Sequence, residues 1–85
     1  MGQLPQNIQV EVEILGGIMQ NPNMLTEVLE SVTFEDFYIK RHVVIFEGLC
    51  RLFAEGKDIN ITMLIDAIGR ENLKDVGGVT YITEL

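Results

Sequence analysis

The stretch from Ile39 to Glu55, IKRHVVIFEGLCRLFAE, constrains the fold of this chain more than any other part of it. Ile45, Phe46, Leu49 and Phe53 recur at the spacing that places side chains on one face of a helix. Further apolar residues on either side make this face broader than an ordinary amphipathic stripe. A face this broad suits a helix with neighbours on several sides. The stretch therefore predicts a central helix around which the other segments pack.

Turn and capping residues divide the rest of the chain into short helices. Asn7 is a good N-cap for a first helix, because its side chain can accept from a free backbone N–H. Pro22 suits the first position of a second helix. Thr33, with Asp36 three residues later, has the spacing of a capping box that leads towards the central helix. Asn60 is the expected N-cap of a helix that follows the central one.

Glycines mark helix ends and close approaches. Gly56 is the expected left-handed residue that ends the central helix. The Gly16-Gly17 pair weakens its helix, which makes sense if another helix crosses closely there. Residues 70–75 form a polar connection, and residues 79–85 form a last helix with Tyr81 among its apolar side chains. We expect an all-α fold, a small globular bundle of about five short helices around a central helix at residues 39–55.

The predicted core draws its members from the first helix, the aromatic segment before the central helix, and the central helix itself. These residues are Leu15, Phe37, His42, Ile45, Phe46, Leu49 and Phe53.

Length and composition indicate a single domain spanning residues 1–85. The net charge of −7 repels phosphate, so direct binding to nucleic acid is disfavoured. The longest apolar run, Val43–Phe46, is far too short to span a membrane, and the first residues lack the pattern of a signal peptide. Cys50 is the only cysteine, which excludes an internal disulfide and fits an inert core thiol. A cytoplasmic protein is the simplest interpretation.

A catalytic centre is not expected. His42 and Cys50 are the one nucleophile–base pair worth testing, but eight residues of helix separate them by about 12 Å. One histidine and one cysteine cannot form a zinc site, and the acidic residues are scattered along the chain. We therefore predict no catalytic, cofactor-binding or metal-binding residues.

Glu11 is the charged residue with two open interpretations. If its helix packs on the central helix, the carboxylate becomes partly buried and needs a partner, which His42 or Arg41 could supply. Alternatively, Glu11 lies at the edge of the apolar stripe and stays solvated.

A series of short motifs, in order and with matching gaps, resembles the N-terminal domain of bacterial replicative DNA helicases of the DnaB type. The motifs are Pro5-Gln6-Asn7-Ile8, Glu11, Leu15-Gly16, Asn21-Pro22, Phe37-Tyr38, His42, Ile45-Phe46-Glu47, Gly56, Val76-Gly77-Gly78, Tyr81 and Leu85. The likeness runs from Pro5 to Leu85. The chain departs from the usual pattern at Val10, Val12 and Asn60, and in the Ile39-Lys40-Arg41 triplet.

The resemblance implies a non-catalytic part of a helicase. In that family the chain continues into a helical hairpin, a linker and a motor domain, which holds the ATP, the magnesium and the DNA-binding loops. The N-terminal domains form a collar over the hexameric ring and, with the hairpin, dock primase. Its implied partners are therefore other helicase subunits and primase, with DNA handled elsewhere. Without the hairpin we expect a monomer or a weak dimer.

Two other classes of function remain open. The first is a free-standing acidic helical adaptor or regulator that shares the same helical plan, and the second is a small enzyme. The residues do not identify a partner-binding surface.

Overall fold

The computed structural model describes residues 8–85, and these residues contain helices and turns but no strand. The α-helices are α1 (Ile8–Gln20), α2 (Met24–Val28), α3 (Lys40–Ala54), α4 (Ile61–Ile68), α5 (Arg70–Leu73) and α6 (Gly78–Thr83). Two 3-10 turns, η1 (Phe34–Asp36) and η2 (Lys74–Val76), complete the order. The prediction of a small all-α domain is confirmed. The expected N-cap Asn7 lies outside the described residues.

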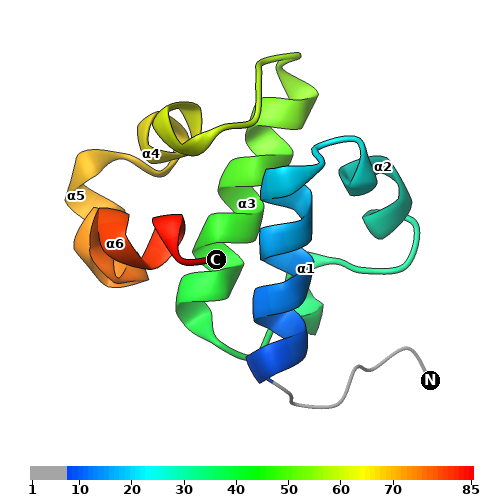
Figure 1. Ribbon diagram of the computed structural model, residues 1–85, viewed down its shortest axis with the longest axis horizontal. Coiled ribbons are helices and arrows are strands. Elements are labelled where there is room, and N and C mark those ends of the chain that lie inside the picture. Colours follow the sequence, from blue (N-terminus) through cyan, green and yellow to red (C-terminus); the bar gives the residue numbers. More distant parts are fainter. Residues whose placement is uncertain (1–7) are drawn as a thin grey trace.

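Helix α3 stands in the middle of the molecule (Figure 1), as the apolar pattern predicts. Helices α1 and α2 lie on one side of it, and α4, α5 and α6 lie on the other. Helices α1 and α3 run side by side in the same direction. The segment containing α2 and η1 leads the chain from the end of α1 back to the level at which α3 begins. The predicted range of the central helix, 39–55, differs from the observed one by one residue at each end, where Ile39 and Glu55 are the caps.

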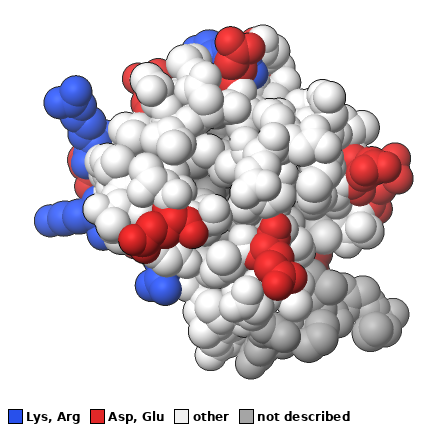
Figure 2. Space-filling model, viewed as in Figure 1, with Lys and Arg blue, Asp and Glu red and all other residues white. Residues whose placement is uncertain are grey.

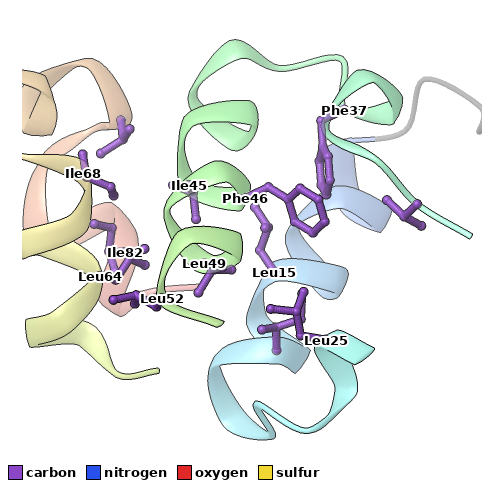
Figure 3. Close-up of a cluster of buried hydrophobic side chains, with 13 residues drawn as sticks. Leu15, Leu25, Phe37, Ile45, Phe46, Leu49, Leu52, Leu64, Ile68 and Ile82 are labelled. Carbon is purple, nitrogen blue, oxygen red and sulfur yellow. The ribbon is translucent and has the colours of Figure 1, made fainter. Parts of the chain in front are cut away.

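The core fills the space on both sides of α3 (Figure 3). Leu15 and Leu25 reach α3 from one side, and Leu64, Ile68 and Ile82 reach it from the other. The rings of Phe37 and Phe46 pack with their centroids 4.9 Å apart, a tilted aromatic contact that adds to the area they bury. Burial of apolar side chains on two faces of one helix explains why its apolar face is so broad.

Of the core residues predicted from sequence, six are buried and one is not. The buried ones are Leu15, Phe37, His42, Ile45, Phe46 and Leu49. Phe53 is 44% exposed, so its assignment to the core is wrong. Because α1 and α3 run in parallel and α1 ends at Gln20, the last turn of α3 extends past α1. Phe53 therefore faces an open pocket beside Pro22 and Asn23 instead of a packed helix.

Two of the predicted caps are confirmed by hydrogen bonds. The backbone N–H of Met63 donates to the Asn60 side chain at 2.8 Å, which opens α4. At the Thr33 capping box, the N–H of Thr33 donates to the Asp36 carboxylate at 2.8 Å, and the Thr33 hydroxyl accepts from Glu35 N–H. The box opens a single 3-10 turn rather than an α-helix, and Phe37 then turns inward in an extended conformation.

Other boundaries differ from the expectation. Pro22 belongs to a turn, and α2 begins two residues later, after Asn23. The polar connection at residues 70–75 is in fact helical, forming α5 and most of η2. Glycines with φ of +88° and +91°, Gly69 and Gly77, bound this short region, and the fully buried Val76 anchors it. None of the described helices is long and apolar enough to cross a membrane.

Close approaches occur at three glycines of α1 and α3. A Cβ on Gly16 would lie 2.9 Å from the backbone carbon of Leu85, so the chain following α6 crosses α1 there, where a helix was expected. A Cβ on Gly48 of α3 would lie 2.9 Å from Leu64 Cδ1 of α4. A Cβ on Gly17 would lie 2.9 Å from Met24 Cε of α2, so a neighbouring helix does approach the Gly16-Gly17 pair, as expected.

Candidate functional site

Glu11, in the first turn of α1, is a buried carboxylate that faces the start of α3. It is only 3% exposed. The backbone N–H of Tyr38 donates to its Oε2 at 2.7 Å, and the N–H of Ile39 donates to its Oε1 at 3.3 Å. Ile39 is the N-cap of α3 and offers no side-chain acceptor. Glu11 therefore places a negative charge at the helix N-terminus, where the helix dipole favours it.

His42, in the first turn of α3, is fully buried and connects two other helices. Its Nδ1 lies 2.7 Å from Glu11 Oε1, and its Nε2 is hydrogen-bonded to the hydroxyl of Tyr81 in α6. A carboxylate can only accept, so Nδ1 carries the proton. In the neutral imidazole, Nε2 then accepts from the tyrosine hydroxyl. Both ring nitrogens therefore have partners.

Tyr81 completes this group, which we call the Glu11–His42–Tyr81 network. Its ring stacks on the imidazole of His42 at a centroid distance of 5.8 Å. The guanidinium of Arg41 also lies over the Tyr81 ring. Its Cζ is 4.6 Å from the ring centroid, which is within cation–π range. The network joins α1, α3 and α6, which are far apart in the sequence.

Two opposing effects act on the pKa of Glu11. Burial by itself raises that pKa, because it penalises the charged form. The hydrogen bond with His42 and those from Tyr38 and Ile39 lower it, and electrostatic attraction between the carboxylate and the His42 ring adds to them. The balance leaves the pKa of Glu11 below its ordinary value of 4.5. The carboxylate is thus held ionised inside the protein by its donors.

The network has the order of groups found in a catalytic relay, but it is closed. The imidazole has no exposed surface, and both of its nitrogens are used. The pockets beside Phe53, Arg51, Ile82 and Arg70 are not lined by any member of the network. Its geometry suits the joining of three helices at a fixed register, because a satisfied buried polar group is specific about its partners.

The first interpretation of Glu11 is confirmed, and its partner is His42. Arg41, the alternative partner, lies over Tyr81 instead. From the sequence, Tyr81 is identified as an apolar residue of the last helix and as one of the residues that carry the family resemblance, but its place in the network is not predicted. The available signal was its hydroxyl, since a tyrosine that packs against a core usually finds a hydrogen-bond partner, and Tyr81 is partly buried.

Comparison with known proteins places this architecture in a family. The sequence profile described as "DnaB-like helicase N terminal domain" matches residues 3–85, almost the whole chain. The chain belongs to the DnaB-like helicase N-terminal domain family. The resemblance that the motif series indicates is thereby confirmed.

Relatives of this DnaB-like domain are much longer proteins. The Replicative DNA helicase DnaB of Pasteurella multocida is 34% identical over 82 residues, which cover 95% of this chain and 18% of that protein. The Geobacillus stearothermophilus protein of the same name is 33% identical over the same share of each. The one from Nostoc is 37% identical over 95% of this chain and 9% of its own length. The chain thus spans less than a fifth of these relatives.

Cys50, considered above as a nucleophile, lies half-buried in α3 of the DnaB-like domain. Burial raises the pKa of its thiol, and the negative charge of Glu47 raises it further. A raised pKa leaves less of the reactive thiolate at neutral pH. Neither nitrogen of His42 bonds to it, since their partners are Glu11 and Tyr81. Within residues 8–85, no three His, Cys, Asp or Glu side chains are grouped to hold a metal ion.

Proposed function

We propose that this DnaB-like domain is a non-catalytic part of a replicative DNA helicase, where it helps assemble the hexameric collar and docks primase. The observation that carries the proposal is the family match over residues 3–85, combined with relatives whose names are replicative DNA helicases and of which the chain spans 18% or less. ATP and magnesium belong, on this proposal, to a motor domain elsewhere in the full-length protein. Such a helicase works on the chromosome, in the cytoplasm.

The structure supports a role as a scaffold. Its buried polar side chains, Glu11 and His42, bond to each other and so serve the fold. The chain's net charge of −7 disfavours direct contact with DNA, while leaving protein partners accessible. We therefore assign DNA binding to other parts of the helicase and protein contacts to this domain.

Primase binding is the first test. The chain, and a version extended through the hairpin that follows it in the family, are titrated against primase from the same bacterium by isothermal titration calorimetry. We expect the extended version to bind and the chain alone to bind more weakly. If neither the chain nor the extended version bound primase, the docking role would be contradicted.

Assembly and catalysis are tested on the same two proteins. Sedimentation is expected to show a monomer or weak dimer for the chain and a larger assembly for the extended version. An ATPase assay on the chain is expected to show no turnover. Measurable ATP hydrolysis by the chain alone would overturn the assignment of a non-catalytic role. A stop codon directly after residue 85 in the gene would instead overturn the proposal that the chain is part of a longer helicase.

A further inference from the structure

Charge is distributed unevenly along this domain. Residues 8–39 contain six acidic residues and no lysine or arginine, whereas residues 40–85 contain seven acidic and six basic residues. The excess negative charge therefore belongs to α1, α2 and η1. Figure 2 shows the same contrast, with blue side chains along the edge beside α5 and red ones at the opposite edge over α2.

The segment of residues 24–38, which contains α2 and η1 and is called the α2–η1 arm here, exposes large apolar side chains. Three residues anchor it to the core, namely Leu25, Val32 and Phe37. Three others point outward: Leu29 is 39% exposed, Phe34 48% and Tyr38 63%. Exposed aromatic residues on one short segment are characteristic of protein–protein contact surfaces.

Local hydrogen bonds hold the two aromatic residues in this outward arrangement. The Thr33 capping box fixes the η1 turn, so that Phe37 enters the core while Phe34 stays outside. The backbone of Tyr38 is held by its hydrogen bond to Glu11. An arm whose backbone is already ordered loses less entropy when a partner binds.

Acidic side chains lie on the same short segment as these apolar residues. Glu27, Glu30 and Glu35 are exposed, and in the part of the chain that the structure describes their carboxylates have no hydrogen bond or ion pair. Asp36 is already used by the capping box. The three free carboxylates give the arm a negative potential that is not cancelled locally.

We propose that the α2–η1 arm docks a basic amphipathic segment of a partner protein. The apolar face of that segment would cover Phe34 and Tyr38, and its lysines or arginines would pair with Glu27, Glu30 and Glu35. Nucleic acids and anionic membranes are repelled by the same charges. This inference goes beyond the proposed function, because it names a surface and the chemistry of its partner and holds whether or not that partner is primase.

Among residues 8–85, four large exposed apolar residues lie outside the arm. Ile8, at the start of α1, is a single aliphatic side chain, 51% exposed. Phe53, Ile61 and Val79 are comparably exposed, but they belong to the half of the chain that carries all the lysines and arginines. Phe53 shares its pocket with Lys57 and Asp58, whose opposite charges cancel. A basic segment is therefore drawn to the arm by charge, and Phe53 serves as a matched control.

The test uses a labelled synthetic peptide, an 18-residue amphipathic helix with leucine on one face and lysine on the other. Its control replaces every lysine by glutamate. NMR of the labelled chain is expected to show shifts concentrated at residues 24–38 with the lysine peptide and none with the control. Shifts centred on another surface, or spread evenly, would overturn the proposal.

Matched variants separate the arm from general charge attraction. F34S is expected to weaken peptide binding about tenfold, and F53S to leave it within about twofold. The triple variant E27Q/E30Q/E35Q should weaken it about tenfold, while E47Q/E71Q/E84Q, with the same change of net charge at exposed positions, should have a much smaller effect. Equal losses in the two triple variants would overturn the proposal.

Two further outcomes keep this inference separate from the proposed function. Self-association of the chain that is abolished by F34S would make a second copy the occupant and overturn the choice of a basic partner. Failure of primase to bind would contradict the proposed docking role but would leave the peptide results as they stand.

Discussion

The two sides of α3 are built in different ways. On the side of α1, α2 and η1, a buried carboxylate, an imidazole and two backbone N–H groups meet at the start of α3, beside the Phe37–Phe46 contact. On the side of α4, aliphatic side chains pack directly on α3 at Gly48. The first side is positioned by specific polar contacts and the second by close apolar packing. Tyr81, from α6, links the two.

The difference explains why one side can carry excess charge. Glu27, Glu30 and Glu35, on or beside α2 and η1, are exposed, and the buried Glu11 of α1 is compensated by its donors. In residues 40–85, by contrast, which include α3 itself, six lysines and arginines offset all but one of the seven acids. A domain with one acidic part and one nearly neutral part can meet two kinds of partner without mixing them.

The largest effect is expected at the centre of the core, where the two sides meet α3. Phe46 is almost fully buried and packs on Phe37, so Phe46→Ala should lower the free energy of unfolding by about 3–5 kcal/mol. The control is Phe53→Ala, in the same helix but exposed, for which less than about 1 kcal/mol is expected. Urea denaturation of both variants measures this. Equal losses of unfolding free energy in the two variants would show that the core extends to Phe53.

Gly48→Val tests the α4 side. A Cβ at this position would meet Leu64 at 2.9 Å and Ile68 at 3.3 Å, so a branched side chain must push α4 away from α3. Overpacking of this kind should cost about 1–3 kcal/mol. Ala54→Val, at an exposed position of the same helix, controls for the helix preference of valine. A thermal melt unchanged from the parent would contradict close packing at Gly48.

Glu11→Gln tests the opposite side. The substitution removes the charge that His42 and two backbone N–H groups face, and it places an amide N–H₂ among those donors. A loss of about 1–3 kcal/mol is expected, the usual range for a buried group left without a proper partner. The control is Glu13→Gln, which makes the same change at an exposed position two residues further along α1. If the two variants had similar free energies of unfolding, the Glu11–His42–Tyr81 network would not contribute to how α1, α3 and α6 are joined.

The pH dependence of stability has a definite sign. Because the pKa of Glu11 is lowered on folding, the unfolded chain takes up a proton first as the pH falls. The contribution of Glu11 is therefore complete above about pH 4.5, its ordinary pKa, and is lost as the pH falls through the lower folded value. Denaturation of the parent and of Glu11→Gln across this acidic range should give curves that converge at low pH. Parallel curves would contradict the lowered pKa.

The sequence shows part of this architecture clearly. Apolar periodicity places α3 to within one residue at each end, and local chemistry places the caps at Thr33 and Asn60. The exposure of Phe53 could not be predicted, because it depends on where α1 ends relative to α3. Residues 70–75 look like a loop because single helical turns have no periodicity to detect.

Only two of the three residues of the Glu11–His42–Tyr81 network could be predicted from the sequence, for a similar reason. Glu11 and His42 attract attention because charged and polar residues on apolar stripes need partners, and packing of α1 on α3 was expected. The third partner, Tyr81, arrives through the path of α4, α5 and α6, which no local pattern specifies. A polar residue on an apolar stripe thus reveals that it requires a hydrogen-bond partner. Which residue becomes that partner depends on the topology of the fold.

The smallest predicted effect tests whether the two sides are truly coupled through Tyr81. Tyr81→Phe keeps the ring, with its contacts to His42 and Arg41, and removes only the hydroxyl that bonds His42 Nε2. A loss of about 1 kcal/mol is expected, with faster hydrogen exchange in α6 than in α1, because α6 loses its polar link while α1 keeps Glu11. Tyr38→Phe is the matched control, since Tyr38 is the other tyrosine of the chain and its side chain is 63% exposed. If both variants exchange and unfold alike, the hydroxyl of Tyr81 does not hold α6, and packing alone joins the two sides of α3.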